Sequence, residues 1–175
     1  MRLTSISAVA IYLVLLAGCV AMPMNRTYYE PNPADGTPIR SSSCGWNATA
    51  LDALERDIGG IVISVFPRYE KGKPLSIYVL LGKPAKSVDT NFEMVELRAR
   101  GSAASVRPIT TNTKSAGPYY FMSANYVFPS SFDADEIALT FLPGFIKLDG
   151  RDIVVAPFRF KRTTKSDFYY NSINC

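Results

Sequence analysis

LSIYVLL, residues 75–81, carries an apolar side chain at every second position: Leu75, Ile77, Val79 and Leu81. Successive side chains of a β-strand point to opposite faces of the sheet, so these four residues share one face. The same period recurs at Met122, Ala124, Tyr126 and Phe128, and at Ile137, Leu139 and Phe141. The pattern predicts strands that each bury one face.

Further strand-like segments follow along most of the chain. IVISVFP, beginning at Ile61, is an apolar run with the length of a buried strand. The turn-forming stretches PRYEKGKP, GKPAKSVDT and PSSFDADE separate such segments. We expect an all-β fold of about seven to nine strands, an antiparallel β-sandwich of immunoglobulin-like or related type, with a small β-barrel as the alternative. The expected strands lie near residues 61–66, 75–81, 92–100, 104–109, 119–128, 136–142, 145–148, 151–155 and 157–161.

One turn can be predicted in residue detail. The Asp149-Gly150 pair in FIKLDGRDIVV is a strong signal for a two-residue β-hairpin. Pairing outward from this turn sets Lys147 opposite Asp152, and Ile146 opposite Ile153. Opposite charges meet on one face and apolar residues meet on the other, so the register is self-consistent.

A change of phase marks the stretch FEMVELRAR. Phe92 and Met94 keep one phase, whereas Val95, Leu97 and Ala99 keep the other. A β-bulge accommodates a one-residue slip inside a strand, so we expect a bulge near Met94 and Val95.

One short N-terminal helix is expected in NATALDALERDIGG, residues 47–60. Leu51, Leu54 and Ile58 fall at positions i, i+3 and i+7 of this stretch. Thr49 can cap the first turn, and Gly59 can end the helix.

The N-terminus has the composition of an export signal. Arg2 is followed by the apolar run ISAVAIYLVLLAG, which stops at Cys19. This run is shorter than the roughly 20 residues that a spanning helix needs, and it has the length of the apolar part of a signal peptide.

The end of the run, Leu16-Ala17-Gly18-Cys19, resembles the lipobox of bacterial lipoproteins. The resemblance implies cleavage before Cys19 and attachment of lipid to this cysteine, and a plain secretory signal peptide is the alternative. Val20 stands where inner-membrane retention signals usually have aspartate, so the resemblance implies an anchor in the outer membrane, facing the periplasm.

Two cysteines remain once Cys19 is assigned to the lipid. Cys44 and Cys175 form an even pair, and the periplasm oxidises thiols, so we expect a disulfide between them, with two unpaired thiols as the alternative. The proline-containing stretch between Cys19 and Cys44 has little apolar periodicity and predicts an extended tether. The expected organisation is a signal peptide over residues 1–18, a lipid-attached tether over 19–43 and a β-sandwich domain over 44–175.

The composition restricts the possible chemistry. The 175 residues include no histidine, which excludes Ser-His-Asp and Cys-His catalysis and most transition-metal sites. The formal net charge of +4 is spread along the chain, without the basic runs that neutralise nucleic-acid phosphates. We therefore expect a protein that is not an enzyme, with no cofactor, no metal and no nucleic-acid partner.

Two groups of residues are candidates for binding a partner. Tyr119 and Tyr120 are neighbours on a predicted strand, so one of them can be exposed and contact a glycan or a protein. Arg159 and Lys161 share one face of the last predicted strand, while Phe158 faces the other way. This basic face could meet an acidic partner, although a charged face in solvent is the simpler interpretation.

An acidic turn is the remaining candidate for chemistry. SSFDADE places Asp133, Asp135 and Glu136 close together in sequence. Such oxygen ligands could hold Ca²⁺, and two carboxylates could act as acid and base on a sugar. The Ca²⁺ loop pattern is not met, so a solvated turn is the expected outcome.

Three functions fit these features. The first is a non-enzymatic envelope lipoprotein that binds a partner or supports a cell-envelope complex. The second is an inhibitor or immunity lipoprotein against a periplasmic toxin or wall-lytic enzyme, with a working loop in the weakly patterned residues 101–120. The third is a carboxylate enzyme acting on glycans, which requires two acidic side chains that converge in one cleft.

Overall fold

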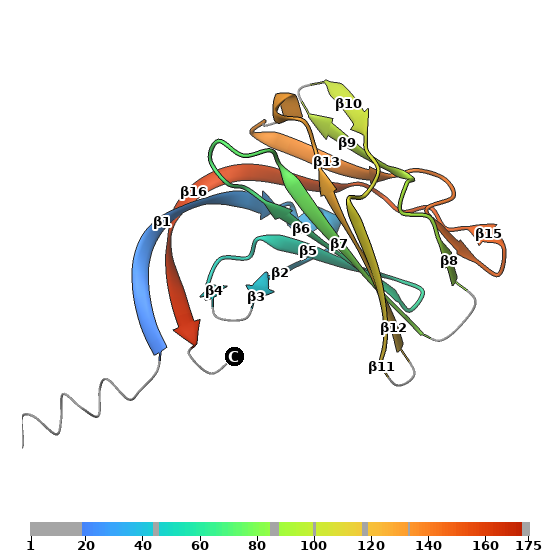
Figure 1. The fold of residues 1–175 in the computed structure, drawn as a ribbon, viewed down its shortest axis with the longest axis horizontal. Coiled ribbons are helices and arrows are strands. Elements are labelled where there is room, and N and C mark those ends of the chain that lie inside the picture. Colours follow the sequence, from blue (N-terminus) through green and yellow to red (C-terminus); the bar gives the residue numbers. More distant parts are fainter. Residues whose placement is uncertain are drawn as a thin grey trace, which may run out of the picture.

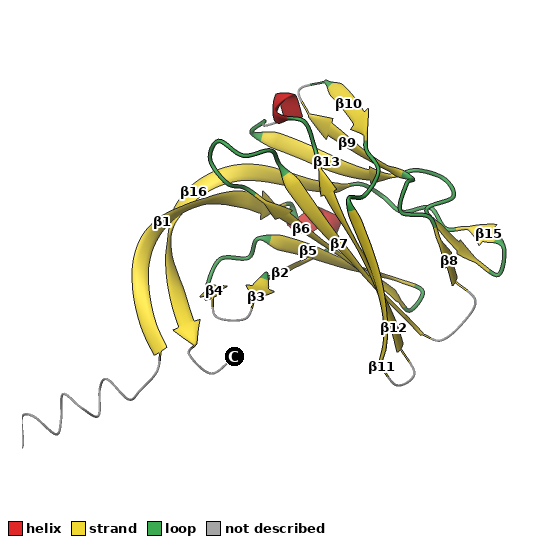
Figure 2. Ribbon diagram, in the orientation of Figure 1, coloured by secondary structure: helices red, strands yellow, loops and turns green. Residues whose placement is uncertain are grey.

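The computed structural model describes residues 19–43, 46–84, 88–99, 101–116, 119–132 and 134–172. Within these ranges the chain forms antiparallel β-sheets and two short 3-10 turns, and contains no α-helix (Figure 2). The two turns are η1 (Pro33–Asp35) and η2 (Ser130–Phe132).

Two large sheets and one small sheet make up the fold (Figure 1). The seven-stranded first sheet contains, in order, β10 (Ser102–Ser105), β9 (Val95–Ala99), β13 (Glu136–Phe141), β16 (Phe158–Ser172), β4 (Trp46–Ala48) and β3 (Ser42–Ser43), and β1 (Cys19–Pro31) also pairs with β16. The six-stranded second sheet contains β11 (Thr110–Ala116), β12 (Tyr119–Val127), β7 (Ser76–Pro84), β6 (Ile61–Arg68), β5 (Ala53–Ile58) and β2 (Thr37–Ile39). The small sheet contains β15 (Arg151–Asp152), β14 (Ile146–Leu148) and β8 (Val88–Thr90).

The core lies between the inner faces of the two large sheets. Ile77, Val79 and Leu81 of β7 are fully buried, as the alternation in the sequence predicts. They belong to one apolar cluster with Leu97 of β9 and Phe158 of β16. No sheet of the described chain closes on itself. The antiparallel sandwich is therefore confirmed, and the small barrel is not formed.

The predicted Asp149-Gly150 hairpin is confirmed. Asp149 and Gly150 both have positive φ, at 50° and 76°, as a type I′ turn requires. Lys147 pairs with Asp152, and their charged groups lie 4.0 Å apart.

The helix expected in residues 47–60 is wrong. Its second half forms β5, which pairs with β2 and β6. Leu54 is fully buried in this strand, whereas Leu51, expected on the same helix face, is exposed. Gly59 and Gly60 form a two-residue hairpin, because Ile58 pairs with Ile61. Pairing with β2 and β6 outweighs the local helix propensity of this segment. The Gly59-Gly60 pair is the local feature of the sequence that favours a hairpin between two strands.

The bulge expected near Met94 and Val95 is also wrong. A turn precedes β9: the backbone N–H of Met94 donates to the carbonyl of Asn91 at 3.1 Å. The Asn91 side chain accepts from the N–H of Glu93 at 3.0 Å. Phe92 therefore lies in the turn, and the change of phase marks the beginning of the strand at Val95.

The tether expected over residues 19–43 is folded instead. β1 pairs with β16 along its whole length, from Cys19 opposite Ser172 to Pro31 opposite Phe160. Tyr29 is fully buried, and its hydroxyl donates to the carbonyl of Ala134 at 2.7 Å. The sandwich thus begins before residue 44. Residues 1–18, Cys44 and Cys175 lie outside the described residues.

Candidate functional site

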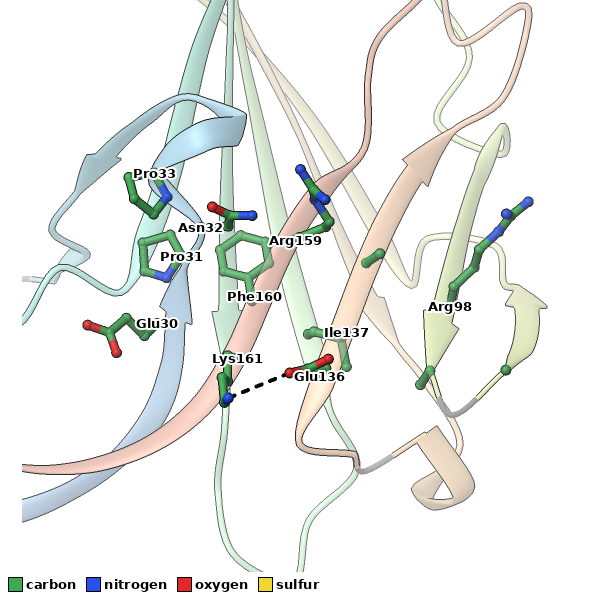
Figure 3. A pocket seen from close by; sticks show the side chains of 13 residues that line it. Glu30, Pro31, Asn32, Pro33, Arg98, Glu136, Ile137, Arg159, Phe160 and Lys161 are labelled. Carbon is green, nitrogen blue, oxygen red and sulfur yellow. Dashed lines mark ion pairs between the residues drawn. The ribbon is translucent and has the colours of Figure 1, made fainter.

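A cavity of about 630 Å³ lies on the outer face of the first sheet (Figure 3). Residues from β9, β13, β16, the end of β1 and the start of η1 line it. Its charged side chains are Glu30, Arg98, Glu136, Arg159 and Lys161.

The alternation of β16 explains how two of these cations reach the surface. Phe158 and Phe160 are buried in the core. Arg159 and Lys161 point the other way, and their side chains are 57% and 73% exposed. The predicted arrangement of this strand is confirmed, because neighbouring residues of a strand face opposite sides.

Strand register places the cavity over a small residue. Ala138 of β13 lies opposite Arg98 of β9 on one side and opposite Arg159 of β16 on the other. Figure 3 shows the two arginines rising from the strands that flank β13. A methyl group between two long side chains leaves a hollow, so Ala138 forms part of the cavity floor.

A second row of charges crosses the same face. Lys161 lies opposite Glu136 on one side and Glu30 on the other. The Lys161 ammonium is 3.7 Å from Glu136, and Glu30 pairs with Lys165 at 2.6 Å. These pairs are exposed and contribute little to stability, so they can exchange for charges on a partner.

Arg159 is held in place by a buried carboxylate. Asp35 Oδ2 accepts hydrogen bonds from the Arg159 backbone N–H at 3.0 Å and from Nε at 2.8 Å. This side-chain hydrogen bond lowers the pKa of Asp35 below its usual value and raises the pKa of Arg159. The guanidinium remains more than half exposed. The site therefore presents an oriented cation that carboxylates can still approach.

Arg98 is the third cation at the rim. Its Nε donates to Glu96 Oε1 at 2.7 Å, and its side chain is 62% exposed. The cavity is thus bordered by three exposed cationic groups, each paired with a carboxylate: Arg98 with Glu96, Arg159 with Asp35 and Lys161 with Glu136.

The tyrosine candidates lie elsewhere. Tyr119 and Tyr120 begin β12, which belongs to the second sheet, so the structure does not bring them to the cavity of Arg159 and Lys161. The Tyr120 side chain is partly exposed. The Tyr119 side chain lies outside the described residues. Phe121 is also exposed, and its ring lies over Gly82.

The acidic turn does not gather its carboxylates. Asp133 lies outside the described residues. Asp135 pairs with Arg162 at 2.5 Å, whereas Glu136 turns towards Lys161. Of these two residues of the acidic turn, Glu136 lines the cavity and Asp135 does not. The carboxylates of Asp135 and Glu136 therefore point to different partners, and they do not form the convergent pair that glycan hydrolysis requires.

The expected loop at residues 101–120 is mostly strand. β10 and β11 occupy Ser102–Ser105 and Thr110–Ala116, and β11 pairs with β12 from Thr110 opposite Asn125. Threonines and small residues give this stretch its weak apolar pattern, because edge strands face solvent. Between β10 and β11 the described part of this stretch leaves only the short connection of residues 106–109, in which Ile109 is 60% exposed.

The described residues contain no group of three or more His, Cys, Asp or Glu that could hold a metal ion. No helix among them is long and apolar enough to cross a membrane. Cys19 is the first residue of β1, and its side chain lies outside the described residues.

Sequence reasoning missed Arg98, Glu30 and Asp35. Each lies far from Arg159 in the sequence. Strand pairing brings Arg98 and Glu30 to the face of Arg159, and the η1 turn places Asp35 against the Arg159 side chain. In the sequence, Arg98 alternates with the apolar residues Leu97 and Ala99, which indicates that the Arg98 side chain faces solvent. Nothing in the sequence indicated which strand would lie next to it.

Comparisons with known proteins found no match: no family model matches the chain, and neither does any curated protein or solved structure. The fold and the cavity define an antiparallel β-sandwich with a charged site on one outer face, lined by arginine, lysine and glutamate side chains.

Proposed function

We propose that the protein is a non-enzymatic lipoprotein, anchored in the outer membrane through Cys19 and facing the periplasm, that binds an acidic segment of an envelope protein. The lipobox-like residues Leu16 to Cys19 support the anchor. The observation that carries the binding role is the cavity over Ala138, bordered by the exposed cations Arg98, Arg159 and Lys161.

The cavity suits recognition better than chemistry. Its basic groups are arginines and a lysine, and the carboxylates that border it, Glu30 and Glu136, each have a lysine partner. An acidic partner segment would replace these weak surface pairs and add hydrogen bonds to the arginines. Attraction of this kind speeds association and weakens as the salt concentration rises.

The anchor is tested by labelling cells with a radioactive fatty acid. We expect label in the wild-type protein, and none in Cys19→Ser, which should leave the membrane fraction. Retention of the Cys19→Ser protein in the membrane fraction, or an unlabelled wild type, would contradict the lipid anchor.

The binding role is tested by crosslinking in intact envelopes, followed by purification under denaturing conditions. We expect one crosslinked partner to be lost in the Arg98→Ala/Lys161→Ala double variant and retained in the matched Lys73→Ala/Lys114→Ala variant. The control lysines are exposed and lie outside the cavity. Equal crosslinking by both variants would contradict the proposed site. The identity of the partner separates a subunit of an envelope complex from a lytic enzyme that the protein would inhibit.

A further inference from the structure

The strands β1 and β16 form a two-stranded ribbon that leaves the sandwich and curves away from it (Figure 1). Its far end is the pair Cys19 and Ser172. The residue expected to carry the lipid is therefore the first residue of a paired strand. A flexible tether between the lipid and the fold is absent from the described residues 19–43.

Apolar and aromatic residues gather at this end of the ribbon. The register pairs Ala21 with Tyr170, Met22 with Tyr169 and Pro23 with Phe168. β4 pairs with the same end of β16, at Tyr169 and Tyr170, and begins at Trp46.

Two of the described side chains at this end are exposed although they are apolar. Met24 is 46% exposed and Phe168 is 47% exposed. Exposed apolar side chains such as these favour the boundary between a bilayer and water over water alone.

The position of Cys19 indicates what covers this surface. The lipid proposed for Cys19 would be attached to the first residue of β1, so it would hold the ribbon end at the surface of the bilayer. We propose that the ribbon end, residues 19–24 with 168–172 and β4, lies in the interfacial layer of the bilayer that holds the anchor. This inference rests on the lipid anchor of the proposed function and adds a protein surface to it.

A buried ion-pair cluster fixes the ribbon to the sandwich. Arg26 of β1 donates to Asp52, which precedes β5, and its Nη1 lies 3.5 Å from Asp167 of β16. Asp167 also accepts from the Thr49 N–H at 2.9 Å, and Asp52 accepts from the Ser41 N–H at 2.7 Å. The cluster joins both ribbon strands to the loops of the second sheet. From Arg26 to Cys19 the ribbon extends about 23 Å at a strand rise of about 3.3 Å per residue. The domain would thus stand at a set distance and orientation from the membrane.

Trp46 provides an internal probe, because it is the only tryptophan of the chain. The purified lipidated protein is reconstituted in vesicles of phosphatidylethanolamine and phosphatidylglycerol that contain phosphatidylcholine brominated near the carbonyl end of its chains. We expect the bromines to quench Trp46 fluorescence. We expect Met24→Ser/Phe168→Ser to reduce this quenching about twofold or more, because the variant loses its apolar contact with the interface. Val154→Ser is the control: Val154 is 90% exposed, precedes β16 and lies away from the ribbon end.

The outcomes separate the two proposals. A lipidated protein whose Trp46 is not quenched, or is quenched equally in Met24→Ser/Phe168→Ser, would overturn the interfacial contact and leave the anchor intact. A protein that carries no lipid would overturn the anchor itself. Circular dichroism spectra that match the wild type show that a variant remains folded, so reduced quenching reports the contact.

Discussion

Asp35 and Arg159 form a three-point contact that ties the N-terminal segment to the beginning of β16. The carboxylate accepts from the Arg159 backbone N–H and Nε through Oδ2, and from Nη2 at 2.5 Å through Oδ1. Arg56 of the second sheet donates from Nε to the Asp35 carbonyl at 2.7 Å. Its guanidinium also lies 4.4 Å from the centre of the Phe158 ring. Asp35 therefore joins η1 to both sheets and also orients a cation of the proposed binding site.

Replacing this carboxylate tests its role in stability. Asp35→Asn keeps the shape of the side chain but loses the charge and one acceptor. We expect the free energy of unfolding to fall by about 1–3 kcal/mol, because hydrogen bonds to charged groups are lost in a buried position. Urea denaturation measures this change. Asp89→Asn is the control, because Asp89 is exposed on β8. Equal stabilities of the two variants would show that the contact contributes nothing measurable.

The pKa values predict an acid dependence of stability. The Arg159 hydrogen bond lowers the pKa of Asp35. Burial raises the pKa of Asp167, but hydrogen bonds from Thr49 and Phe168 outweigh it, and the pKa lies below its usual value. An aspartate with a lowered folded-state pKa stabilises the fold above its unfolded value of about 3.9, and this contribution is lost as the pH falls towards the folded pKa.

The wild type should therefore lose stability between about pH 5 and pH 2, and the Asp35→Asn/Asp167→Asn variant should lose less. Urea denaturation across this range measures the two slopes. Parallel pH profiles would exclude these two carboxylates as the source of the acid dependence.

The buried hydroxyl of Tyr29 tests whether residues 19–31 belong to the fold. Tyr29→Phe leaves the carbonyl of Ala134 without this donor in the core. We expect a loss of about 1–2 kcal/mol, because an unsatisfied buried acceptor retains its desolvation cost. Tyr120→Phe, at a partly exposed position, should change the stability by less than about 0.5 kcal/mol. If β1 were a loose tether, neither variant would differ from the wild type.

A close approach of two backbones predicts the effect of adding one methyl group. A Cβ at Gly36 would lie about 2.4 Å from the backbone carbonyl oxygen of Glu55. We expect Gly36→Ala to destabilise the fold by about 1–3 kcal/mol, because β2 must move away from β5. At Gly82 the nearest atom to an added Cβ is in the Phe121 ring at 3.4 Å. Gly82→Ala should therefore be nearly neutral in thermal unfolding, and a reversed order would contradict the packing of β2.

The disulfide between Cys44 and Cys175 remains a prediction, because both cysteines lie outside the described residues. Trp46, two residues after Cys44, begins β4, and Asn47 pairs with Tyr170, five residues before Cys175. Peptide mass spectrometry without reduction should find the two cysteines linked. On the chain-entropy model, a loop of about 130 residues gains roughly 4–5 kcal/mol from the bond, so reduction should lower the unfolding temperature. Two alkylated free thiols in the native protein would exclude the bond.

The sequence indicated the β-sandwich, most of its central strands and the outward face of Arg159 and Lys161. Alternation is a local property of a strand with one buried face, so it can be recognised without knowing the partner strand. The Asp149-Gly150 hairpin is local for the same reason. The helix prediction failed because the spacing of Leu54 and Ile58 also fits a helix. Their strand, β5, is instead fixed by its pairing with β6 and β2.

The tertiary structure alone decided the ribbon and the site. β1 buries Tyr28 and Tyr29 but exposes Pro23 and Met24, so it shows no continuous apolar period, and its pairing with β16 is what reveals it as a strand. The cavity depends on Arg98, Ala138 and Arg159 lying side by side, although they come from three strands that are distant in sequence. Local sequence thus determined which face each strand buries, because that choice depends on neighbouring residues. The partners of each strand, and therefore the candidate site, depend on contacts between distant segments.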